Sequence, residues 1–338
     1  MNYQRGLHKD FISLLAHGGA LNSLVQPQEL RVGNNVVPLS SQFRKGNRVS
    51  IYLGETALLH ILYKAQSNTI VFESENHRGL FPDTFLTTYP LDSQDQLMSA
   101  IAPWPGGVLV NVEGLARHVE KEGKWQAALA ERFGRNHQVG DPWCIIDTQA
   151  VIEGAGSDEA IKKSRILDWE WKRFERLRGH PLTHDELKKA DIKPPRDGIR
   201  KADAIGVSRQ GDMVIMEVKP ADANPSEVYS SPIQLAGYVD IWAYFIGEEG
   251  KGAVCSQINE LIEQKKAVGL LPENAPSLHP NFSITPVLSI CGERSTDKVE
   301  SALQIALDIA KETTGDHGQL MKLARFDTLS PLQPVFTE

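Results

Sequence analysis

Cysteine is scarce in this chain, with 3 residues among 338, and Cys144, Cys255 and Cys291 lie far apart. They have neither the even number of a disulfide framework nor the close spacing of a zinc site. This usage is typical of a reducing cytoplasm, which is where we expect the protein to act. Long apolar runs are also missing. No stretch approaches the roughly 18 apolar residues of a membrane span, so we expect no membrane partner.

Several motifs that would identify a chemistry are absent as well. The first half of the chain has no phosphate-binding glycine motif, no internal repeat and no spacing that suggests a catalytic triad. His180 and His184 have metal-ligand spacing, but Pro181 disfavours the helix on which both would face one ion. The sequence of the first half therefore contains no motif that indicates a reaction.

The length allows two folded domains, or one large domain with an embellishment. The chain has 338 residues, and its composition of 41% hydrophobic and 23% charged residues is typical of a globular protein. The segment EGAGSDEA, around residue 155, interrupts the pattern and is the best boundary. We predict an α/β domain over 1–155, for recognition or regulation, and a second domain over 156–338. In the first domain the patterns predict strands over 48–53, 68–74, 107–112 and 143–148 and helices over 55–65 and 116–133.

The second domain alternates between helices and strands. We predict helices over 158–179, 183–190, 230–247 and 297–314, and strands over 201–207, 213–218 and 283–292. Pro232 suits the first turn of its helix, and Gly247 would end it. The first of these helices has a candidate buried stripe of Ile161, Ile166, Trp169, Phe174 and Leu177.

Positive charge is concentrated in one segment, although the formal net charge of the chain is −7. Residues 162–201 hold 13 Lys and Arg against 7 Asp and Glu. The negative total argues against a protein that simply coats nucleic acid. The local excess fits either a solvated basic helix and loop or a surface that faces phosphates, and charge alone does not choose between them.

Two charged residues interrupt the apolar strand MVIMEVKP at 213–220. Side chains two apart on a strand point to the same face, so Glu217 and Lys219 project together. Asp203, on the preceding strand of the hairpin, would place a second carboxylate beside Glu217. Two adjacent carboxylates repel one another, and a divalent cation such as Mg²⁺ relieves that repulsion. The ammonium could then orient an attacking water or neutralise charge on a phosphate.

A second pair of polar residues follows on the next helix. Gln234 and Tyr238 are one turn apart and share a face. Taken singly, each pattern has a plain structural explanation, because a Glu-x-Lys pair in a strand is usually a solvated ion pair. The order of the acidic residue, the Glu-x-Lys strand and the Gln-xxx-Tyr helix is much less common by chance.

In this order, Asp203, Glu217-Val218-Lys219 and Gln234-Leu-Ala-Gly-Tyr238 resemble the metal-dependent nuclease superfamily named for its PD-(D/E)xK motif, in its RecB-like branch. The resemblance covers residues 158–247 and implies a restriction-endonuclease-like core, a mixed sheet flanked by helices, after a separate α/β domain. The chain departs from the pattern at Ala202, where the motif has proline, and in the long gap between Lys219 and Gln234.

The resemblance also implies a role for each residue. Asp203 and Glu217 would bind Mg²⁺ or Mn²⁺, and Lys219 would assist the attacking water. Gln234 and Tyr238 would support the site or contact DNA.

Further residues of the site are expected on and after the first helix of the second domain. Many members place a glutamate there near the metal, and Glu170 is preferred to Glu175 by its distance before Asp203. The cations expected to hold the nucleic-acid backbone are Lys172, Arg173, Arg176, Arg196, Arg200 and Lys201.

These expectations combine into a metal-dependent deoxyribonuclease, such as a restriction, repair or phage-defence effector. A homodimer is expected because one site cuts one strand, and the first domain could bind a protein partner. Two alternatives stay open: an inactive nucleic-acid-binding or scaffolding module on the same fold, and a small-molecule enzyme or sensor in the first domain. The sequence does not separate endonuclease from exonuclease activity or DNA from RNA.

Overall fold

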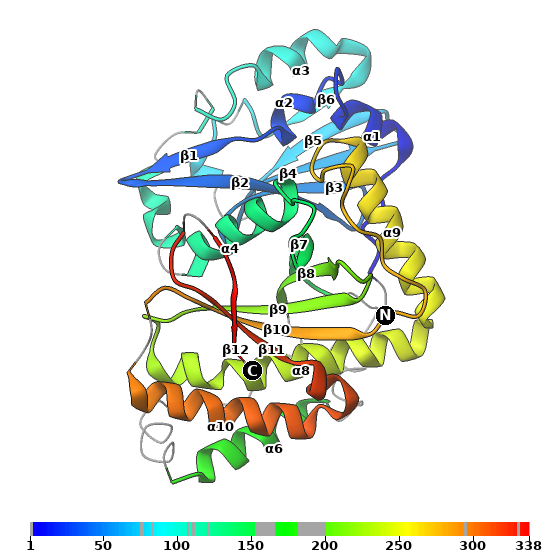
Figure 1. Ribbon diagram of the computed structural model, residues 1–338. Helices are drawn as coiled ribbons and strands as arrows, with labels where there is room; N and C mark the ends of the chain where they lie inside the picture. The colour runs from blue at the N-terminus through cyan, green and yellow to red at the C-terminus, as the bar shows by residue number, and fades with distance from the viewer. Residues whose placement is uncertain are drawn as a thin grey trace. The chain divides into compact units, whose positions relative to one another are not determined.

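The chain folds as two compact units in the computed structural model (Figure 1). Unit 1 comprises Met1–Tyr3, Thr148–Cys255 and Leu278–Glu338, and unit 2 comprises Gln4–Asp147 and Ser256–Ser277. Both units combine a β-sheet with helices, which confirms the α/β class. The domain boundary at residues 155 and 156 stays a prediction. The structure describes residues 3–74, 78–82, 84–106, 108–109, 112–119, 122–152, 166–181, 201–293, 296–329 and 332–337.

Unit 2 is built on an antiparallel six-stranded sheet in the order β1-β2-β3-β4-β5-β6. Apolar side chains such as Phe43, Ile51 and Phe72 are buried along its strands. The strands are β1 (Glu29–Val32), β2 (Asn35–Arg44), β3 (Arg48–Leu53), β4 (Thr56–Lys64), β5 (Thr69–Glu73) and β6 (Thr88–Pro90). The helices are α1 (Lys9–Leu15), α2 (Asn22–Val25), α3 (Gln94–Ile101), α4 (Glu122–Ala130) with a π-helical turn over Glu131–Arg135, and most of α9 (Lys251–Ala267).

Residues 56–64 form strand β4, so the helix predicted over 55–65 is wrong. Ala, Leu and Lys favour a helix locally. However, β4 pairs with β3 on one side and β5 on the other, and Leu58, Leu59 and Ile61 are fully buried there. Strand pairing and burial therefore override local propensity.

The other predictions for the first half are mostly confirmed. Strands β3, β5 and β7 (Trp143–Ala150) lie where the patterns place them, and α4 forms within the predicted helix. The strand predicted over 107–112 is not found at its described residues 108, 109 and 112, and Val112 begins a 3-10 helix.

Unit 1 is built on a mixed sheet in the order β12-β11-β10-β9-β8-β7, to which this unit contributes only the last three residues of β7, from Thr148 to Ala150. Strand β8 is antiparallel to β9, β10 runs parallel to both β9 and β11, and β12 is antiparallel to β11. The predicted strands over 201–207, 213–218 and 283–292 are confirmed, whereas β11 and β12 were not predicted. Their bounds are β8 (Ala202–Ser208), β9 (Met213–Pro220), β10 (Ile284–Cys291), β11 (Lys322–Phe326) and β12 (Val335–Thr337).

Helices cover one face of this mixed sheet. Helix α8 (Pro225–Glu249) lies against β9 and β10, and α6 (Ile166–Gly179) and α10 (Asp297–Thr313) pack on α8 (Figure 1). The buried ring of Trp242 on α8 meets Tyr3 edge-on at 5.0 Å and Phe245 at 5.8 Å. None of the helices in the described ranges combines the length and apolarity that a membrane crossing requires.

Helix α8 is longer than predicted at both ends. Asn224 caps it by accepting a hydrogen bond from Ser226 N, and it continues past Gly247 to a cap at Gly250. Pro232 lies inside the helix and not in its first turn. Proline has no N–H for the carbonyl of residue 228, four positions earlier. The Ser231 hydroxyl donates to that carbonyl at 2.6 Å instead, which explains why the helix tolerates the proline.

Helix α6 buries a different face from the one predicted. Phe174 and Leu177 are buried as expected, but Trp169 is 48% exposed. Polar residues take its place, because Glu170 and Arg173 are almost fully buried. Ile161 and the helix predicted over 183–190 lie outside the described residues.

Candidate functional site

Strand β9 brings Glu217 and Lys219 together, as their spacing predicts. Lys219 Nζ lies 3.3 Å from Glu217 Oε1, and the two side chains are only 12% and 2% exposed. A surface ion pair in water contributes little to stability, and charged residues are rarely buried unless they have a role or a partner. The pair is therefore not the solvated ion pair that a Glu-x-Lys strand usually carries.

Asp203 reaches the same strand from β8. Its Oδ2 accepts a hydrogen bond of 2.8 Å from the backbone N–H of Val218, the residue between Glu217 and Lys219. Asp203 directly precedes Ala204, which pairs with Met216 in the antiparallel β8–β9 hairpin. The hairpin therefore fixes the Asp203 carboxylate at the backbone between the two charged side chains of β9.

Among the buried side-chain oxygens with no hydrogen bond to the residues that the structure describes are Glu217 Oε2 on β9 and Gln234 Oε1 on α8. The two elements are in contact. A buried carboxylate oxygen normally has a hydrogen bond or a cation next to it. Carboxylate and amide oxygens suit Mg²⁺, which uses one or two carboxylates and retains several waters. The oxygen donors of Glu217 and Asp203 therefore have the chemistry that suits a hard divalent cation.

The Gln234–Tyr238 turn of α8 also approaches α6. Gly237, between these two residues, lies so close to Glu170 that a Cβ built on it would be 3.0 Å from Glu170 Oε2. Glu170 is fully buried, whereas Glu175 is exposed and lies 3.6 Å from Arg178. Of the two glutamates considered from the sequence, only Glu170 points into unit 1.

Glu170 does not form a three-ligand metal site with Asp203 and Glu217 in this structure. Across the ranges that are described, no group of three or more His, Cys, Asp or Glu is placed to hold a metal ion. Glu170, Asp203 and Glu217 therefore all stay predicted ligands.

The six cations expected to hold nucleic acid differ in their positions. Lys172, Arg176 and Lys201 are exposed. Arg173 is 2% exposed: its guanidinium donates to Asp240 Oδ2 at 2.5 Å and to the Thr313 hydroxyl at 2.8 Å. The Arg173 guanidinium is therefore bound within the protein and does not belong to the exposed cations that could contact nucleic acid. Arg196 and Arg200 lie outside the described residues.

The Arg173–Asp240 pair joins α6 to α8. Burial raises the pKa of the Asp240 carboxyl, and the hydrogen bond and charge of Arg173 oppose that rise. Because the pair is buried, loss of one partner would leave the other charge without compensation. This contact helps to hold α6, and with it Glu170, against α8.

The sequence analysis missed a buried charge cluster in unit 2. Asp147 accepts from Arg44 at 2.7 Å and from Arg5 at 3.3 Å, and all three side chains are almost fully buried. Lys265, also buried, is a further charged neighbour. Arg5 and Asp147 are 142 positions apart, so no local pattern could have indicated the cluster.

The site was also compared with known proteins. A scan against protein-family models, a search of curated proteins and a search of solved structures found no match to this chain. The function is therefore argued from the geometry of the site itself.

Proposed function

We propose that the chain is a metal-dependent nuclease that hydrolyses DNA phosphodiester bonds at the Asp203, Glu217 and Lys219 site of unit 1, on a restriction-endonuclease-like core. The observation that carries the proposal is the buried Glu217–Lys219 pair with the Asp203 carboxylate at the backbone between them. The mixed sheet with α8 on one face supports the proposal at the level of architecture.

The cation held by Asp203 and Glu217 would be Mg²⁺ or Mn²⁺, which polarises the phosphate and makes bound water more acidic. Lys219 would donate a hydrogen bond to the attacking water or to a non-bridging phosphate oxygen. The attacking water would lose a proton to solvent as its oxygen forms the new bond to phosphorus. The opposite P–O ester bond would break, and the leaving oxygen would take up a proton from solvent. Gln234 and Tyr238 would orient Lys219 and the phosphate from α8.

The exposed cations Lys172, Arg176 and Lys201 would hold the phosphate backbone, with little reading of base sequence. A homodimer would allow both strands of a duplex to be cut. A role in restriction, repair or phage defence, and a protein partner for the first domain, remain part of this proposal.

The test is cleavage of linear and circular DNA, single- and double-stranded, and of RNA, each with Mg²⁺, Mn²⁺ or a chelator. We expect metal-dependent cleavage of DNA by the native protein. Glu217→Gln and Lys219→Met keep the size of the side chain and should each lower the rate by about 10²- to 10³-fold. Cleavage of the circular substrate identifies an endonuclease.

The matched control is Glu249→Gln, an exposed glutamate at the end of α8 in the same unit. It should cleave like the native protein. Circular dichroism and melting temperature show whether each variant is folded. Full metal-dependent activity in both folded site variants would overturn the assignment. DNA binding without cleavage under any metal condition would favour the inactive module instead.

A further inference from the structure

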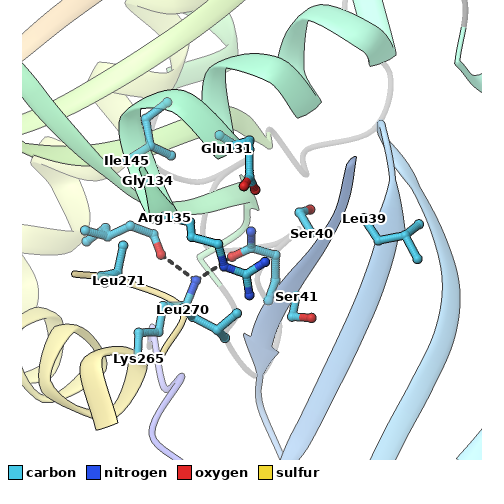
Figure 2. Close-up of a pocket in the computed structure, with 13 residues that line it drawn as sticks. Leu39, Ser40, Ser41, Glu131, Gly134, Arg135, Ile145, Lys265, Leu270 and Leu271 are labelled. Carbon is cyan, nitrogen blue, oxygen red and sulfur yellow. Dashed lines mark hydrogen bonds between the residues drawn. The ribbon is translucent and has the colours of Figure 1, made fainter. Parts of the chain in front are cut away.

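A small pocket in unit 2 lies outside the proposed nuclease site. It is bounded by β2, the π-helical turn after α4, β7 and α9 (Figure 2). Figure 2 shows Lys265 and Arg135 extending from opposite sides toward its middle, with Glu131 above them. Its volume is about 30 Å³. That is enough for about two water molecules.

The Lys265 ammonium is buried in the wall of this pocket. Its Nζ donates to Gln42 Oε1 and to the Ile146 carbonyl, both at 2.6 Å. Both acceptors are neutral, and an ammonium has three donors. The neighbouring Asp147 carboxylate is already engaged by Arg44 and Arg5. Burial lowers the pKa of Lys265 to about 8, which still leaves most of the amine protonated at pH 7.

Arg135 faces Lys265 across the pocket. Its terminal nitrogen donates to the Val25 carbonyl, but its Nε is buried and makes no hydrogen bond within the described part of the chain. Burial lowers the pKa of Arg135, and Glu131 opposes this shift. Glu131 in turn accepts a hydrogen bond from Asn136 at 3.1 Å. The ionisable side chains that line the pocket are thus two cations and one carboxylate, which leaves one positive charge in excess.

We propose that this pocket binds the carboxylate group of a small organic acid or of a peptide C-terminus. One oxygen would accept from Lys265 and the other from Arg135 Nε, which makes two charge-assisted hydrogen bonds. Leu39, Leu270 and Leu271 also line the pocket, and an apolar tail would contact them beyond the space that the carboxylate takes up.

The experiment measures melting temperature and calorimetric affinity of the full chain with hexanoate, hexanamide, acetyl-Gly-Leu, its C-terminal amide and inorganic phosphate. Lys265→Met and Arg135→Met each remove one positively charged donor group while keeping an extended side chain. Lys266→Met is the matched control, because Lys266 is the next residue of α9, pairs with Glu263 and does not line the pocket.

One or both acids should raise the melting temperature, because a ligand that binds only the folded state stabilises it. The amides should not. Each pocket variant should weaken binding of the acid by about ten- to a hundredfold, as expected for a lost charge-assisted hydrogen bond. Lys266→Met should bind normally. Tighter binding of hexanoate identifies a free acid as the ligand, and tighter binding of acetyl-Gly-Leu identifies a chain terminus.

Four results would overturn the proposal: no shift with either acid, which means that water alone fills the pocket; equal shifts with acids and amides; a shift with phosphate alone; or unchanged affinity in both folded pocket variants. The readout is binding to unit 2 residues, so it is independent of nuclease activity at Glu217.

Discussion

Replacement of Lys265 by methionine should change how the stability of the protein depends on pH. The pKa of Lys265 is lowered from 10.5 to about 8, mainly by burial, with Arg44 and Arg5 adding to the shift and Asp147 and Cys144 opposing it. The unfolded chain therefore holds this proton more tightly than the folded one. The sign follows directly: between pH 8 and about 10.5 the unfolded state binds more protons, so stability rises with pH.

The magnitude follows from the two pKa values. At pH 7 the charged, buried lysine costs about 3 kcal/mol, and at pH 9.5 the cost falls to about 1 kcal/mol. The difference in free energy of unfolding between the native protein and Lys265→Met should therefore change by about 2 kcal/mol from pH 7 to pH 9.5, in favour of the native protein. Methionine has a similar volume without the charge, but it leaves Gln42 Oε1 and the Ile146 carbonyl without their donor. That loss is the same at every pH, so the prediction concerns how the difference changes with pH.

The assay is urea unfolding of both proteins between pH 7 and pH 9.5, followed by circular dichroism in a buffer free of carboxylates. If the units unfold separately, the transition that Lys265→Met shifts is the one to follow. Burial also raises the pKa of the Cys144 thiol to about 12, which opposes stability at high pH, but Cys144 is present in both proteins. Lys266→Met is the control. A constant difference between native protein and Lys265→Met across the range would refute the reasoning.

Three further variants test contacts in unit 1 by urea unfolding. Ser231→Ala should lower the free energy of unfolding by about 1–3 kcal/mol, because the Val228 carbonyl loses its donor and Pro232 has no N–H to replace it. The control is Ser301→Ala, since the exposed Ser301 hydroxyl also donates to a helix carbonyl. An equal effect in both variants would contradict the explanation. Asp240→Asn should cost about 3–5 kcal/mol by leaving the buried Arg173 charge without its partner. The control is Asp308→Asn, at an exposed site, which should have little effect on stability. An equally small effect of Asp240→Asn would contradict the prediction. Gly237→Ala gains about 1 kcal/mol of helix propensity but forces Glu170 to move, so stability should change little while metal-dependent cleavage falls. Cleavage at the native rate would show that the position of Glu170 does not matter, and Gly247→Ala, with open space around its Cβ, serves as control.

Local patterns predicted much of the candidate site. The two-residue period of a strand places Glu217 and Lys219 on one face, and the short turn before β9 brings Asp203 beside them. The same logic failed for β4, because its apolar residues fit a helix as well as a strand until pairing with β3 and β5 decides. In α6 the apolar stripe placed Trp169 inside, whereas Glu170 and Arg173 are buried, and Arg173 pairs with Asp240 on α8.

By itself, the sequence determined the α/β class, most helices and strands of the described second half, and the joint projection of Glu217 and Lys219. These features depend on the periodicity of side chains and on turns between neighbours, which a few consecutive residues contain. Only the tertiary structure decided which charges are buried and what surrounds them. Lys265 and Gln42 are 223 positions apart, and the pocket beside them exists only after β2, β7 and α9 have packed. Burial of a charge depends on such distant partners, so no local pattern of residues records it.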